Sequence, residues 1–200
     1  MNNLFLLQTF IHLAFQLGLT GLTVDRVETP GPVRILLMII MNIALTFLMY
    51  MQSIPLPIRF VMFCLFSIFN GYIVSMYTEN VDREVIRNAI VETLAIFMMM
   101  VGVGIVFNQM GVDISPLIML AFMYSIAMIA VLLYQLFFRV SKTERNYVRL
   151  AMIGLMMLYI VVHTYMNMSE DYENDIVIST LNYYTDILSI FKNLVRYSEE

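Results

Sequence analysis

Residues 179–193 read STLNYYTDILSIFKN, an apolar stretch with an aspartate near its middle. At the helical repeat of 3.6 residues, positions i, i+3, i+7, i+10 and i+14 fall on one face. In this stretch those positions hold Ser179, Asn182, Asp186, Ser189 and Asn193. The pattern therefore predicts a helix with one polar edge, and the role of that edge depends on the solvent around the helix.

The composition of the chain identifies that solvent. Of the 200 residues, 60% are hydrophobic and 13% are charged, and the mean hydropathy is +0.81. A water-soluble domain of this size could not cover so much apolar surface. We therefore expect a membrane protein, with lipid as its main solvent.

Seven apolar runs are each long enough to cross a bilayer, which takes roughly 20 residues of helix. They cover residues 4–22, 33–53, 57–77, 85–107, 115–138, 147–168 and 176–195. Strands of a membrane barrel would be about half as long. We expect an all-α polytopic membrane protein, a seven-helix transmembrane bundle that forms a single transmembrane domain over residues 1–200. The seventh run contains Asp186 and Lys192, so it either spans the membrane or dips in and returns.

The basic residues cluster in or beside alternate gaps between these runs. The first, third and fifth gaps with the run ends beside them, and the C-terminal end, hold every Lys and Arg except Arg59. The positive-inside rule places that side in the cytosol. Seven crossings would then put the N-terminus on the lumenal or external side and the C-terminus in the cytosol.

An aspartate inside a membrane needs a partner, a proton or water, because burying its charge costs about 2.5–3.5 kcal/mol even on the lenient insertion scale. Asp186 is therefore either a polar contact that joins helices or part of an ion or proton path. Three intramembrane residues are candidate partners: His163, Asn70 and Glu92. Glu92 could instead lie near enough to the interface to reach water.

Small residues recur every four positions in the third run, at Ser67, Gly71 and Ser75. Such a face lets two membrane helices approach closely. We interpret it as a packing surface and not as a site of chemistry.

Five stretches of the chain are distinctive: LFSIFNG at 65–71, AIVETLAIF at 89–97, VDIS at 112–115, IGLMMLYIVVHTY at 153–165 and LNYYTDILSIF at 181–191. Together they resemble the Bax inhibitor family, the transmembrane Bax-inhibitor-motif proteins. The last is similar to the family's closing Leu-Tyr-Thr-Asp-Ile-Ile-Asn-Ile-Phe pattern and is the most specific of the five. The chain would be a divergent member, and its Asn, Ile, Met and Tyr content would suit a virally captured copy.

The resemblance implies a seven-helix bundle in which aspartates on the sixth and seventh helices share a proton. In the family this pair is a pH sensor that gates a calcium leak from intracellular stores, and the physiological result is suppression of cell death. Asp186 matches the aspartate of the seventh helix. His163 stands where the other aspartate is expected, and Asn70 replaces a glutamate of the third helix.

These replacements change the expected electrostatics. Two carboxylates repel each other, whereas an aspartate and a histidine attract each other. If the two residues meet, we expect Asp186 to stay ionised and His163 to stay protonated. Calcium would then find one carboxylate, Asp186, beside a competing cation, so any binding there should be weak. No other cofactor is expected.

Two functions from different classes follow from these residues. The first is a calcium leak channel or pH-sensitive ion pathway of the endoplasmic reticulum or Golgi that inhibits apoptosis. Its pathway and pH sensor would be Asp186 and His163, with supporting polar residues Asn70, Asn182, Ser179, Ser189 and Glu92. The second is a non-conducting homologue that binds membrane partners in cell-death signalling.

Other classes of function have no support in the sequence. An enzyme is not expected, because the sequence has no nucleophile with a base, no metal-ligand spacing and no nucleotide-binding loop. The bilayer is the main expected partner, and neither a nucleic acid nor a small-molecule substrate is inferred.

Overall fold

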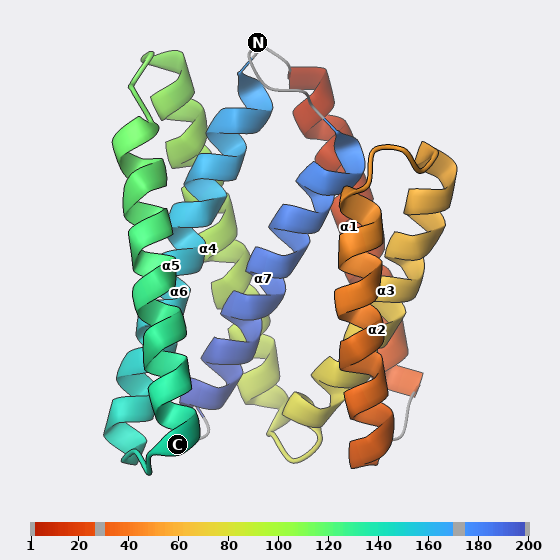
Figure 1. The fold of residues 1–200 in the computed structure, drawn as a ribbon, viewed down its shortest axis with the longest axis vertical. Coiled ribbons are helices and arrows are strands. Elements are labelled where there is room, and N and C mark those ends of the chain that lie inside the picture. Colours follow the sequence, from red (N-terminus) through yellow and green to blue (C-terminus); the bar gives the residue numbers. More distant parts are fainter. Residues whose placement is uncertain (1–2, 27–30, 170–174, 199–200) are drawn as a thin grey trace. The chain divides into compact units, whose positions relative to one another are not determined.

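The computed structural model describes residues 3–26, 31–169 and 175–198. These residues form seven α-helices and no strand (Figure 1). The helices are α1 (Asn3–Arg26), α2 (Pro32–Tyr50), α3 (Leu56–Thr78), α4 (Arg83–Gln109), α5 (Ser115–Phe137), α6 (Lys142–Met168) and α7 (Ile176–Ser198). Each helix overlaps one of the seven predicted runs, so the all-α expectation is confirmed for the described residues.

The first residue of α6 differs from the one that the apolar pattern predicts. α6 begins at Lys142, five residues before the predicted run, because Ser141 and Glu144 form a capping box there. The Ser141 Oγ accepts from the backbone N–H of Glu144 at 3.2 Å, and the Glu144 carboxylate accepts from the backbone N–H of Ser141 at 2.7 Å. A charged first turn was therefore part of the helix and not of the gap.

The turn before α5 is held by Asp113. Its carboxylate accepts the backbone N–H of Ser115 at 3.0 Å, and this hydrogen bond holds the pKa of the Asp113 carboxyl below its usual range. The α4–α5 turn also contains Gly111, whose φ of 64° lies in the left-handed region that glycine tolerates best.

Burial is inverted relative to a water-soluble protein. Large apolar side chains such as Phe47, Leu136 and Phe137 are 72–77% exposed, while Gln16 and Ser67 are fully buried. Lipid can solvate apolar side chains but offers no partner to polar groups, so polar groups face other helices. This distribution supports the inference that lipid surrounds the helices.

Six helices are long and apolar enough to cross a membrane, namely α1 to α6. α7 is not among them, and it carries Asp186, Lys192 and Arg196. The chain is a polytopic membrane protein by this standard, and among the described residues six spans are supported by length and composition, so the seventh span that the apolar runs predicted is not confirmed.

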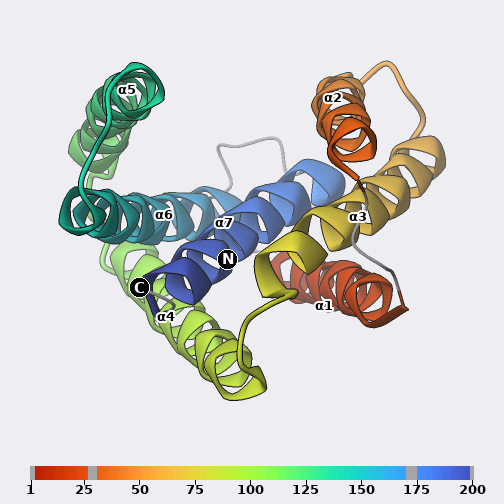
Figure 2. The same ribbon diagram turned by 90° about the horizontal axis from the view of Figure 1, so that it is seen from below.

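The chain divides into two compact units, which are described separately. One contains residues 3–82 and 173–184, and the other contains residues 83–172 and 185–200. In the first, α3 contacts both α1 and α2, and in the second, α6 contacts both α4 and α5 (Figure 2). We call them the α1–α3 unit and the α4–α6 unit, and each includes a part of α7.

In each unit two helices approach closely at a glycine. A Cβ added to Gly71 on α3 would lie 2.5 Å from the Cβ of Thr23 on α1, and Ser67 and Ser75 on the same face are buried. A Cβ added to Gly104 on α4 would lie 2.6 Å from the Cβ of Thr164 on α6. The small-residue face of the third run is thus a helix contact, as predicted.

Candidate ion-pathway site

His163 on α6 and Asp186 on α7 meet within the α4–α6 unit. The Nδ1 atom of His163 lies 2.9 Å from Oδ2 of Asp186, a hydrogen-bonding distance. The Asp186 side chain is 6% exposed and that of His163 is 19% exposed. The contact that the polar edge of the last helix led us to expect is therefore present.

Tyr159 lies directly against His163. The two rings are stacked with centroids 5.6 Å apart and planes 19° apart. The Tyr159 hydroxyl is 2.7 Å from the Ser125 Oγ on α5, and Ser125 also donates to the carbonyl of Ala121. This chain of contacts holds the plane of the imidazole from the side of α5.

The sequence carries a signal for the position of Tyr159. Residues four apart on a helix are neighbours, and Tyr159 precedes His163 by four. Its bond to Ser125 had no such signal, because nothing in a single sequence pairs a residue of one helix with a residue of another.

Burial makes the pairing of Asp186 costly to break. A charged group removed from water is stable only when a partner and hydrogen bonds compensate it. Loss of one partner of a buried ion pair costs about 3–5 kcal/mol in general, since the other charge is left uncompensated. Asp186, at 4% exposure, is in that situation, and His163 is the partner that its Oδ2 contacts.

Two other predicted residues, Glu92 and Ser189, belong to the α4–α6 unit, and the hydrogen bond between His163 and Asp186 includes neither of them. Glu92 is exposed on α4, so the structure does not bring it into the buried pair. Ser189 lies one turn after Asp186 on α7, and its carbonyl accepts from Asn193 Nδ2 at 2.8 Å. The polar edge thus continues past Asp186 toward the end of the helix.

Three predicted residues belong to the α1–α3 unit. Asn70 donates to the Phe66 carbonyl of its own helix at 3.0 Å. Asn182 on α7 accepts from the Tyr50 hydroxyl at 2.8 Å, and Ser179 is buried. In this unit the polar edge of α7 therefore contains a contact with α2.

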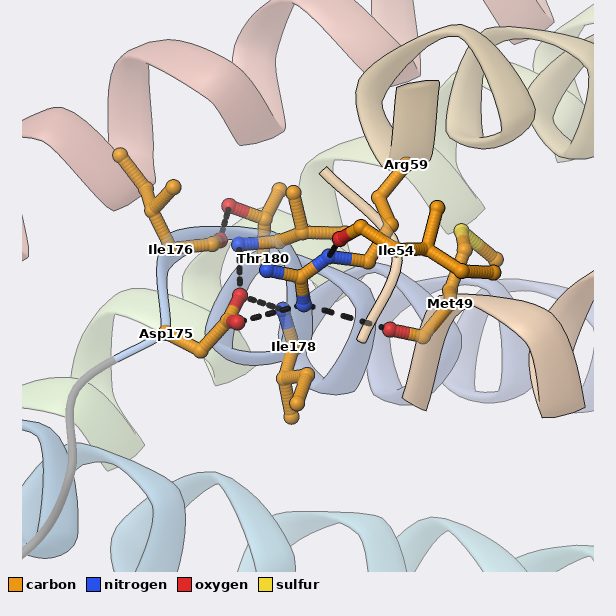
Figure 3. A network of polar contacts seen from close by, with 8 residues as sticks. Met49, Ile54, Arg59, Asp175, Ile176, Ile178 and Thr180 are labelled. Carbon is orange, nitrogen blue, oxygen red and sulfur yellow. Dashed lines mark hydrogen bonds and ion pairs between the residues drawn. The ribbon is translucent and has the colours of Figure 1, made fainter. Parts of the chain in front are cut away.

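A buried ion pair in the α1–α3 unit does not follow from the sequence pattern, in which Arg59 lies beside the gap between the second and third runs. Arg59 is 6% exposed, and its Nη1 lies 2.5 Å from Oδ2 of Asp175, just before α7 (Figure 3). Arg59 also donates to the carbonyls of Ile54 and Met49. The positions of charged residues in the sequence do not show whether an arginine is exposed in a loop or buried between helices.

The same aspartate begins α7. Its second oxygen accepts the backbone N–H groups of Val177 at 2.9 Å and Ile178 at 3.2 Å, as a helix-capping residue does. Asp175 therefore joins the start of α7 to the start of α3 through Arg59.

An uncharged polar network lies deeper in the α1–α3 unit. Ser67 donates to Gln16 at 2.7 Å, and the hydroxyls of Thr20 and Tyr184 are 2.6 Å apart. Gln16 and Tyr184 are fully buried. Thr9, Gln16 and Thr20 share one helical face of the first run, a pattern that could have revealed one side of this network.

No group of three or more His, Cys, Asp and Glu side chains in the described ranges is arranged to hold a metal ion. At Asp186 the structure offers one carboxylate next to an imidazole. Calcium takes six to eight oxygen ligands, so this site alone could not satisfy the ion.

The helices and the buried histidine–aspartate contact define the class of the protein as a multi-pass helical membrane protein with an ionisable pair in its interior. The family model described as "Inhibitor of apoptosis-promoting Bax1" matches residues 2–199. The chain therefore belongs to the Bax inhibitor family, and membership points to a membrane protein that modulates apoptosis. No curated protein matches the chain significantly.

Proposed function

We propose that this protein is an ion-leak pathway of the endoplasmic reticulum or Golgi membrane that lowers stored calcium and so inhibits apoptosis. The observation that carries the proposal is the 2.9 Å contact between His163 and Asp186. Ionisable residues inside membrane helices are costly, and they commonly mark ion or proton paths. Family membership supports the apoptotic role.

His163 sets the pH response in this proposal. A protonated imidazole pairs with the Asp186 carboxylate and competes with an arriving cation. When the pH rises and the imidazole loses its proton, the carboxylate is left to attract calcium. We therefore expect calcium flux to increase with pH, and calcium to bind weakly.

We also propose that α7 makes a seventh crossing. Near the start of α6, Arg149 donates to the carbonyl of Arg196, near the end of α7, at 2.6 Å. Together with the contact of His163 and Asp186, this bond supports an α7 that runs antiparallel to α6. A segment that dipped in and returned would end on the side where it began.

Calcium flux in liposomes tests the pathway. The purified protein is reconstituted with a calcium indicator inside, and flux is measured between pH 6 and pH 8. We expect wild-type flux to rise with pH, Asp186→Asn to reduce it at every pH, and His163→Gln to remove the pH dependence. His163→Asp restores a pair of carboxylates and should shift the pH response.

Asp113→Asn is the matched control, because it removes one carboxylate from an exposed turn and leaves an asparagine that can still accept from Ser115. Its flux should equal that of the wild type. Equal flux in every variant would remove both residues from the mechanism. Absence of flux throughout would instead favour the non-conducting membrane interaction protein, which, like the leak, is not enzymatic.

A further inference from the structure

Four helix ends lie together at one end of the α4–α6 unit. α4 and α6 run parallel from this end, because Asn108 near the end of α4 donates to the carbonyl of Tyr165 near the end of α6 at 3.4 Å. Arg149 joins the start of α6 to the end of α7 through the Arg196 carbonyl. Figure 1 shows the end of α5, the start of α6 and the end of α7 at this end of the unit.

This end is strongly basic. It carries eight basic side chains among the described residues, Arg83, Arg87, Arg139, Lys142, Arg145, Arg149, Lys192 and Arg196, against two acidic ones of the same unit, Glu84 and Glu144, and Asp82, which directly precedes Arg83. The Glu144 carboxylate already accepts from Ser141. The sequence continues with Glu199 and Glu200, which lie outside the described residues.

The opposite end of the unit has the reverse character. In the described turn between α4 and α5 and in the last turn of α6 there is one charged residue, Asp113, and no Lys or Arg. The charge separation along the unit is therefore nearly complete, and it does not follow from the net charge of the chain, which is −4.

Exposed aromatic rings surround the basic end. Phe137 and Tyr147 are 77% and 68% exposed, and Tyr134 is stacked on Phe138 with ring centroids 4.6 Å apart. Tyrosine side chains such as Tyr134 and Tyr147 collect at the level of lipid headgroups, because the ring is apolar and its hydroxyl is polar. The rings therefore indicate that the basic groups lie at headgroup depth.

We propose that this end is a docking surface for the headgroups of anionic phospholipids. Clusters of four to eight Lys and Arg residues next to membrane helices attract acidic lipids. The surface joins positive charge from α4, α6, α7 and the α5–α6 turn to an aromatic border that fits the glycerol region of a lipid. It is independent of ion conduction.

Lipid titration of the purified full chain tests this surface. Delipidated protein in a neutral detergent is titrated with phosphatidylserine or phosphatidylcholine, and bound lipids are counted by native mass spectrometry. We expect preferential binding of phosphatidylserine that weakens at high salt. Soluble glycerophosphoserine, which has the same headgroup but no acyl chains, should bind far more weakly.

Arg139→Gln with Lys142→Gln should weaken phosphatidylserine binding roughly 10- to 30-fold, since each basic residue near an anionic surface contributes about five-fold. The charge-conserving exchange Arg139→Lys with Lys142→Arg should retain wild-type binding. A third variant adds Gln109→Lys and Asp113→Asn to the first pair. These two changes restore the net charge of the whole chain, but they place the positive charge at the opposite end of the unit.

Binding restored by the third variant would show that only net charge matters and would overturn the proposal, as would equal affinity of the wild type for both lipids. The comparisons between the two lipids and between low and high salt use only the wild-type protein. They therefore still test the proposal if a variant fails to fold. Capture of a protein partner that phosphatidylserine does not displace would also overturn it.

Discussion

At the residue scale, the pairs Arg59–Asp175 and His163–Asp186 each place charged or ionisable groups largely out of contact with solvent. Arg59 and Asp175 are 116 positions apart in sequence, yet their side chains are only 7% and 15% exposed. Arginine suits such a position because its five N–H donors can satisfy a carboxylate and backbone carbonyls together. This pair fixes the starts of α3 and α7 against each other.

Removing one partner of this pair should destabilise the fold more than removing both. Arg59→Met leaves Asp175 buried without its cation, and we expect a loss of about 3 kcal/mol or more, on the order of 10 °C in unfolding midpoint for a chain of this size. Arg59→Met with Asp175→Asn keeps a capping side chain and should lose less. Thermal unfolding followed by a thiol dye on Cys64, the chain's single cysteine, measures both.

Asp175→Asn alone separates the two functions of the aspartate, because asparagine caps a helix but carries no charge. Its midpoint should lie below that of the wild type through loss of the ion pair. If Arg59→Met proved no worse than the double variant, the pair would not contribute as a pair.

The contact between His163 and Asp186 could be predicted because each residue is polar inside an apolar run and the family resemblance aligned both. The bond between Arg59 and Asp175 could not, since each lies close to a gap where charge is ordinary. Periodicity describes a face of one helix, whereas a contact needs the partner helix and its rotation. Single-sequence reasoning therefore found polar faces better than it found partners.

At the scale of the element, helix packing depends on two glycines that permit close approach. Gly104 on α4 lies against Thr164 on α6, and a Cβ at Gly104 would also be 2.9 Å from the Val161 carbonyl. Backbone atoms cannot move aside as the end of a flexible side chain can. The spacing of these two helices is thus set by the absence of a side chain.

Gly104→Ala should push α4 and α6 apart and cost about 1–3 kcal/mol, the usual cost of overpacking. Gly102 is the matched control on the same helix, since a Cβ there would meet nothing within 4 Å. Gly102→Ala should be neutral or stabilise by about 0.5–1 kcal/mol, because alanine loses less backbone entropy in a helix. Unfolding midpoints of the two variants give the comparison, and equal midpoints would argue against the packing account.

The helices themselves were largely readable from the sequence, because apolar runs of membrane length have few alternatives. Their ends were less so. The first turn of α6 is charged and was assigned to a gap, although Ser141 and Glu144 have the spacing of a capping box. The apolar runs did not decide whether α7 crosses the membrane. Its polar edge lowers its mean hydropathy, which explains why composition alone does not identify it as a span.

At the scale of the whole molecule, the charge asymmetry predicts the orientation of the chain in its membrane. The described α5–α6 turn is basic and the α4–α5 turn is not, so the positive-inside rule places the first in the cytosol. A topology with both termini in the cytosol and a re-entrant last segment would reverse these two turns.

Single-cysteine labelling decides between the two orientations. In a Cys64→Ala background, Thr143→Cys, at an exposed position in the first turn of α6 beside the basic α5–α6 turn, should react with an impermeant thiol reagent in sealed microsomes. Met110→Cys, at a position 72% exposed in the other turn, should react only after the membrane is permeabilised. The opposite pattern would establish the reversed topology.

The first nine residues of α7 also bear on how the protein is made. Tyr183 and Tyr184 are fully buried and belong to the α1–α3 unit, although they follow all of α1 to α6 in the chain. The three helices of that unit can enter the bilayer long before, but the interior they share stays unfilled until α7 has been translated. A nascent chain that stops before α7 would therefore present an unfinished core to the quality control of the membrane, although α1 to α6 are already made.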